Sequence, residues 1–139
     1  MRAHVIKAPE LVLTYGIDSK TREKLSAVLQ GLFLPERRIL PEETAQQVGY
    51  LAGYQGFQKR EGEKKTAAPC DGVLCLSGLS SSRIDVLLKA LREEKIEIPL
   101  KAVVTPMNQT WSFEKLIEEL EKEHKEILKI QAEKKQRSN

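Results

Sequence analysis

The 139-residue chain has few of the residues that mark a specialised class of protein. It contains two cysteines, six prolines and eight glycines, and aromatic residues make up 5% of it. Two cysteines are too few for a disulfide scaffold, and so little proline and glycine excludes a collagen-like or low-complexity chain. No apolar run approaches the roughly 18 residues of a membrane helix, and the first residues lack the apolar region of a signal peptide. These absences predict a soluble, cytoplasmic protein that does not enter a membrane.

The charge of the chain is high but nearly balanced. Lys and Arg number 23 against 20 Asp and Glu, which gives a net charge of +3, and 31% of the residues are charged. With so small an excess and so few aromatics, nucleic-acid binding is not expected. Hydrophobic residues make up 40% of the chain, enough for a folded core. The length suits one domain over residues 1–139.

Two halves of the chain repeat the same order of predicted elements. A short run of strand-forming residues ends at Gly16 in the first half and at Gly78 in the second. In each half a capped amphipathic helix, a second strand, a proline and another helix follow. An offset of 62 residues places Gly16 on Gly78, and after a small insertion Pro41 falls on Pro106. The predicted parts are an internal repeat over 10–57 and 72–121, a charged linker at 58–69, and a helical extension at 122–139.

This order predicts an α/β fold in which two βαβα units surround a small, mostly parallel sheet, with an extended C-terminal helix. Each unit alone is too small to bury a sizeable core, so both are expected to share one. The alternative fold is an α+β two-layer sandwich in which the halves pair antiparallel about a pseudo-two-fold axis. The likeness of the halves also has an alternative origin in chance, because any two βαβα units look alike at this level.

A stretch of the second half carries a family resemblance. Its marks are a strand ending in Ser77-Gly78, the strand segment Pro99-Leu100-Lys101-Ala102, and Thr105-Pro106 with Asn108 and Trp111 before the last helix. Over roughly Val73 to His124, the chain resembles a bacterial family catalogued as a domain of unknown function, number thirty-seven eighty-three. The resemblance implies no activity, cofactor or catalytic residue, and so it leaves the function open.

Two polar loops follow the strands of the second half, at the strand ends where open parallel sheets bind ligands. The first loop offers hydroxyls and a guanidinium that could hold a phosphate or carboxylate at a helix N-terminus. It lacks the spacing of a P-loop or a dinucleotide fingerprint, and the simpler interpretation is a glycine turn followed by a capping serine. The polar side chains of the second loop could contact a ligand beside an indole, or serve as a helix cap. The candidate ligand-binding residues are Ser77, Ser80, Ser81, Ser82, Arg83, Thr105, Asn108 and Trp111.

No catalytic or metal-binding set is evident in the sequence. Cys70 and Cys75 lack the C-x-x-C spacing of redox and zinc sites, and His4 and His124 have no partner at metal spacing. We therefore predict no catalytic residue, metal or cofactor, and we favour a role other than catalysis. A weaker hypothesis is thiol redox chemistry through an exposed Cys70, with Cys75 packed as a small hydrophobe.

The last helix is the second candidate for function. Its apolar stripe continues past the point at which so small a domain needs it, which is typical of a helix that packs on a partner or a second copy of the chain. The alternatives are that the helix folds back over the sheet or frays. The candidate interface residues are Leu116, Leu120, Ile127 and Ile130.

Two hypotheses of function follow from the sequence. The preferred one is a non-catalytic interaction module that forms a homodimer, or binds another protein, through the C-terminal helix. The competing one is a small ligand-binding protein or enzyme that holds an anion or a nucleotide-type ligand between the loops at 77–83 and 105–111.

Overall fold

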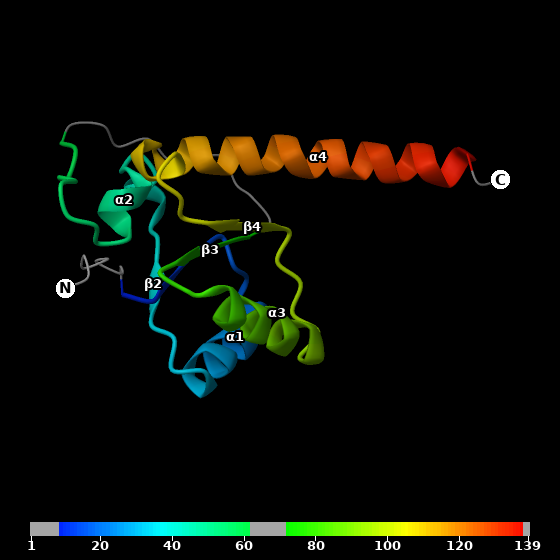
Figure 1. Ribbon diagram of the computed structural model, residues 1–139, viewed down its shortest axis with the longest axis horizontal. Helices are drawn as coiled ribbons and strands as arrows, with labels where there is room; N and C mark the ends of the chain where they lie inside the picture. The colour runs from blue at the N-terminus through cyan, green and yellow to red at the C-terminus, as the bar shows by residue number, and fades with distance from the viewer. Residues whose placement is uncertain (1–8, 62–71, 138–139) are drawn as a thin grey trace, which may run out of the picture.

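The computed structural model describes residues 9–61 and 72–137, and a four-stranded sheet lies at its centre (Figure 1). The strand order is β2-β1-β3-β4. The strands are β1 (Leu11–Tyr15), β2 (Glu36–Arg38), β3 (Val73–Ser77) and β4 (Leu100–Val103). Every residue of β3 is buried, and so are four of the five in β1. These two runs of apolar residues therefore form the centre of the sheet, where both faces are covered.

Four helices accompany the sheet. They are α1 (Ser19–Gly31), α2 (Val48–Leu51), α3 (Ser81–Glu93) and α4 (Phe113–Arg137). Asp18 caps α1 by accepting a hydrogen bond from the Thr21 amide at 2.8 Å, and Ser80 caps α3 in the same way through the Arg83 amide at 3.2 Å. None of the helices within residues 9–61 and 72–137 has the length and apolarity needed to span a membrane.

The sheet is mixed. The outer pairs, β1–β2 and β3–β4, are parallel, whereas the central pair β1–β3 is antiparallel, with Leu13 opposite Cys75. The predicted α/β class with an extended C-terminal helix is confirmed. The antiparallel pairing of the two halves is expected only in the alternative fold. The two-layer arrangement of that alternative is wrong, because apolar side chains project from both faces of the sheet and helices cover both faces.

Two apolar clusters hold the three layers together. On one face, α1 and α3 pack on side chains such as Val12 and Leu74. On the other face, α2 and the first turns of α4 pack on Leu13, Tyr15 and Cys75. Both clusters take residues from both halves of the chain, so the halves share one fold, as the small size of each unit requires.

The two halves adopt equivalent backbones. The bounds of β1 and α1, shifted by the offset of 62 residues seen in the sequence, are those of β3 and α3. Asp18 and Ser80 share the same backbone angles, φ −70° and ψ 163°. The Ile39 amide donates to the Thr14 carbonyl at 2.8 Å, and the Val104 amide donates to the Leu76 carbonyl at the same distance. A duplication as the origin of this likeness stays a prediction.

The segments after β2 and β4 differ from the continuous helices expected there. Each begins with a single 3-10 turn, η1 (Pro41–Glu43) or η2 (Asn108–Thr110). Both segments then extend and pair at an isolated antiparallel bridge between Gln47 and Ser112. A helix follows on each side of the bridge, but α2 ends before Gly53, whose φ of +81° is left-handed, while α4 continues for 25 residues.

Part of the expected linker at 58–69 lies outside the described residues, as do Cys70 and His4. Residues 58–61 are described, and the backbone of Arg60 exchanges two hydrogen bonds with the side chain of Gln46, at 2.7 and 2.8 Å. The described start of the linker is therefore held against the bridge region.

Candidate functional site

The structure brings the two candidate loops together. Because β3 and β4 are parallel neighbours, the loops that follow them lie at the same edge of the sheet. A cavity of about 600 Å³ lies between them, and Leu79 and Thr105 contribute to its wall. The remaining wall includes Tyr54 and Gln55, from the turn after α2, and Gln109 from η2. Among the described residues that line this cavity, none carries a charge.

Arg83 does not face this cavity as a free cation. Its guanidinium makes two hydrogen bonds to the Glu10 carboxylate, at 2.9 and 3.1 Å, and a third to the Leu32 carbonyl at 2.7 Å. The hydrogen bond from Arg83 lowers the pKa of Glu10 below its ordinary value. Arg83 thus connects α3 to the segment before β1 and to the end of α1, and its charge is already neutralised.

The serines of the first loop are also engaged. Ser77 is buried at the end of β3, and its hydroxyl lies 2.9 Å from the hydroxyl of Tyr54. Ser80 is the helix cap, and its hydroxyl lies 3.2 Å from that of Ser82. Ser81 is exposed in the first turn of α3. The interpretation as a glycine turn with a capping serine therefore accounts for this loop.

Asn108 locks the second loop to the end of β4. Its carboxamide oxygen accepts from the Thr105 amide at 2.8 Å, and its carboxamide nitrogen donates to the Val103 carbonyl at 3.0 Å. The Thr105 hydroxyl accepts from the Asn108 amide at 3.1 Å. Trp111 packs partly buried against the core, with the Lys115 ammonium 4.9 Å from its ring centre. These groups stabilise the turn rather than offering free contacts to a ligand.

Tyr54 is not among the residues predicted from the sequence, although its hydroxyl contacts the predicted site residue Ser77. Its position depends on the early end of α2 and on a close approach between that helix and Phe57. A side chain on Gly49 would place its Cβ only 2.6 Å from the ring of Phe57, so glycine allows the turn to fold back on α2. The Tyr54 amide then donates to the Gly49 carbonyl at 2.8 Å.

Reactive and metal-binding side chains are not gathered in the described part of the chain. Within residues 9–61 and 72–137, no group of three His, Cys, Asp or Glu side chains could hold a metal ion. Cys75 is fully buried in β3, and this burial raises the pKa of its thiol to about 12. Since the thiolate is the reactive form, Cys75 is protected from redox chemistry in the folded protein.

The candidate interface residues of α4 divide into two groups. Leu116 is buried in the core and is not available to a partner, whereas Leu120 is partly buried and packs against the core. Ile127 and Ile130 lie farther along α4 and are 52% and 49% exposed. Leu128, which is not among the four candidate interface residues, is 51% exposed beside them. We call residues 121–137 the α4 overhang, because they follow Leu120, the last residue of α4 that packs against the core. In Figure 1 the C-terminal part of this helix extends beyond the sheet and the other helices.

Comparison with known proteins supports the resemblance found in the sequence. The model of a family described as a domain of unknown function, DUF3783, matches residues 73–127. This stretch runs from β3 through α3 and β4 into the overhang, and the description of the family assigns it no activity. No curated protein and no solved structure matches the chain significantly.

Proposed function

We propose that this protein is a non-catalytic interaction module that self-associates through the α4 overhang. The family that matches residues 73–127 has no known function. The observation that carries the proposal is the exposure of three large aliphatic side chains, Ile127, Leu128 and Ile130, on the part of α4 that follows its core-packed turns. The free thiol of Cys75 suits the reducing cytoplasm, which we include in the proposal as its location.

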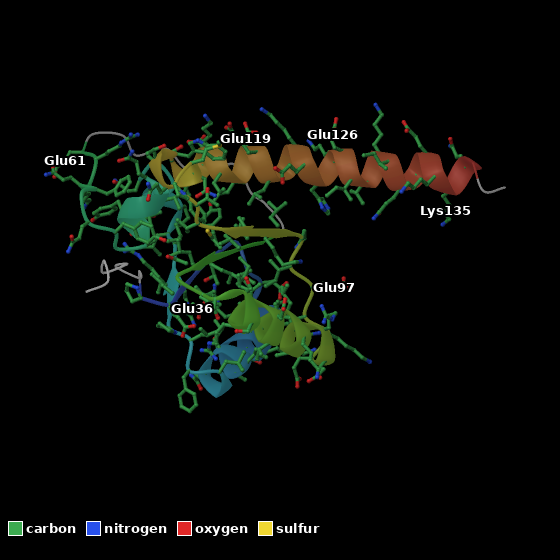
Figure 2. The ribbon with its side chains drawn as sticks, viewed as in Figure 1. Glu36, Glu61, Glu97, Glu119, Glu126 and Lys135 are labelled. Carbon is green, nitrogen blue, oxygen red and sulfur yellow. The ribbon has the colours of Figure 1, made fainter. Side chains whose placement is uncertain are left out.

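The length of the overhang supports a role in binding. Seventeen residues at about 1.5 Å each extend for about 25 Å. Figure 2 shows Glu126 and Lys135 on the part of α4 that extends away from the sheet. Packing of an apolar face, rather than helix propensity, usually stabilises such a segment, so a partner helix would stabilise the overhang.

The competing hypothesis, an anion site between the two loops, has less support. The guanidinium of Arg83, which this hypothesis assigns to the anion, is paired with Glu10. The side-chain carboxamide of Asn108 makes its hydrogen bonds within the turn. The cavity between the loops has the size of a small-molecule pocket, but the lining residues that the structure describes offer no positive charge to a phosphate or carboxylate.

Truncation of the chain after His124 tests the proposal. We expect the full chain to sediment as a dimer at micromolar concentration and the truncated chain to sediment as a monomer. The truncated chain should keep its cooperative unfolding, because Phe113, Leu116 and Ile117, which join α4 to the core, are retained.

A point variant provides the matched comparison. Ile127→Asp should also dissociate the dimer, whereas Val86→Asp, which alters an aliphatic side chain of similar exposure (46%) on α3, should leave it intact. A full chain that is monomeric at micromolar concentration would contradict the proposed function.

A further inference from the structure

The charges of α4 are separated along its length. Residues 114–126, the acidic segment, contain six Glu and three Lys, a net charge of −3. Residues 127–137, the basic segment, contain three Lys, one Arg and one Glu, a net charge of +3. The helix dipole favours this order only within the first and last turns. The glutamates at positions 121–126 lie in the middle of the helix, so the dipole does not account for them.

We infer that the partner of the α4 overhang is a second copy of this chain, bound antiparallel, with the acidic segment of each helix facing the basic segment of the other. The inference rests on the proposed function and adds the partner and its orientation. An antiparallel pair of identical helices is related by a two-fold axis, so every contact between two different positions occurs twice. The opposite charges of the two segments then attract each other at both ends of the contact.

The positions of the charged side chains around the helix agree on one register. At about 100° per residue, Glu121 and Lys135 lie on one side of the stripe that contains Ile127 and Leu128. When Glu121 faces Lys135 of the partner subunit, the midpoint of the contact is residue 128. On the other side of the stripe, Glu123 facing Lys134 of the partner subunit gives nearly the same midpoint.

This midpoint is where the exposed aliphatic side chains are found. Leu128 of one copy would meet Leu128 of the partner subunit, with Ile127 and Ile130 of both copies around it. Apolar burial at the centre with charge pairs at both ends is the usual anatomy of a specific interface. A parallel pair would instead place each charged residue beside its own copy, where like charges repel.

Charge reversal on the two sides of the contact tests the inference. One variant is Glu121→Lys/Glu123→Lys, and the other is Lys134→Glu/Lys135→Glu. We expect each to raise the dimer Kd about ten-fold or more, because four exposed ion pairs become repulsive contacts. An equimolar mixture of the two should recover a heterodimer at least as tight as the parent dimer, since one helix is then basic and the other acidic.

The matched control carries the same charge change on the far side of the helix. Lys122→Glu/Lys129→Glu alters two lysines that lie opposite the stripe, and it should leave the Kd within about two-fold of the parent value. An equal loss in the control, or a mixture that does not recover binding, would overturn the inference. A dimer that persists in all three variants would overturn it as well, while leaving the proposed self-association intact.

Disulfide trapping separates the two orientations. In a Cys70→Ser chain, Glu121→Cys and Lys135→Cys are made separately, mixed and oxidised, and the linked peptides are identified by mass spectrometry. The antiparallel arrangement predicts a predominant link between positions 121 and 135. Predominant 121–121 and 135–135 links would show a parallel pair and overturn the orientation. A monomeric parent chain would instead mean that the proposed function itself had failed.

Discussion

Individual polar residues in this protein are committed to joining elements. The carboxylate of Glu36 on the edge strand β2 accepts from the Thr14 hydroxyl at 2.6 Å and from the Arg22 guanidinium at 2.6 Å. One carboxylate thereby ties β2 to the central strand β1 and to α1. Arg83 has the same role at its own position, with Glu10 and the Leu32 carbonyl as partners. Such pairs cost stability when one partner is removed, since the other is left partly buried and unpaired.

Cys75 gives a prediction at the scale of one residue. Its pKa is about 12 in the folded protein, against an ordinary value of 9.0, so the folded state holds the proton over a range in which the unfolded state loses it. This contribution to stability is complete below pH 9 and is lost as the pH rises toward 12. Relative to Cys75→Ala, we expect the unfolding free energy to fall by about 1.4 kcal/mol per pH unit in this range.

The measurement is urea unfolding at pH 8, 9, 10 and 11, with Cys70→Ser in both proteins so that the second thiol does not contribute. The substitution to alanine also removes packing, but that loss shifts the whole profile without changing its slope. Parallel pH profiles for the two proteins would contradict the protected thiol.

At the scale of elements, the turns after β2 and β4 decide the layout of one face of the sheet. In both turns, a side-chain oxygen accepts a hydrogen bond from the backbone amide three residues before it. Glu43 accepts from the Leu40 amide at 2.9 Å, and Asn108 accepts from the Thr105 amide at 2.8 Å. Each turn then leads into the bridge between Gln47 and Ser112. The helices α2 and α4 start from this bridge and cover the same face.

Asn108 tests the structural interpretation of the second turn. We expect Asn108→Ala to lower the unfolding free energy by about 2 kcal/mol, because it removes an acceptor for Thr105 and a donor for Val103. Asn108→Asp keeps the acceptor and should lose about half as much. Chemical denaturation of the three proteins measures this. Unchanged stability in Asn108→Ala would contradict the structural role and favour the anion hypothesis again.

The whole molecule is two similar units that depend on each other. The central β1–β3 pairing and both apolar clusters cross from one half to the other. The likeness ends at α2 and α4, one of which stops after four residues while the other forms the overhang. The two halves therefore differ most at α4, the helix to which we assign the function.

Separated halves test this dependence. We expect the fragments 9–61 and 72–139 not to fold as monomers, because each would expose one side of the shared core to water. Mixing them should restore the far-ultraviolet circular dichroism of the intact chain. A second fragment carrying Leu74→Asp, which places a carboxylate in the core, should not restore it. A folded monomer of either fragment would contradict the shared core.

Local sequence alone was sufficient for the strands and capped helices. The apolar run at Leu11–Tyr15 and the glycine turns are found where the pattern places them, and a capping residue precedes each of α1 and α3, as expected, at Asp18 and Ser80. Such signals act over a few residues, through side-chain burial and short-range hydrogen bonds, so they can be read without the rest of the chain.

Only the tertiary structure decided how these parts are used. Three features join residues that are distant in the sequence. They are the antiparallel pairing of β1 with β3, the neutralisation of Arg83 by Glu10, and the burial of Leu116 in the core. The apolar stripe of the last helix is continuous in the sequence, yet the sheet ends before the helix does. The sequence therefore determined an amphipathic helix, and the extent of the sheet decided which part of that helix is left for a partner.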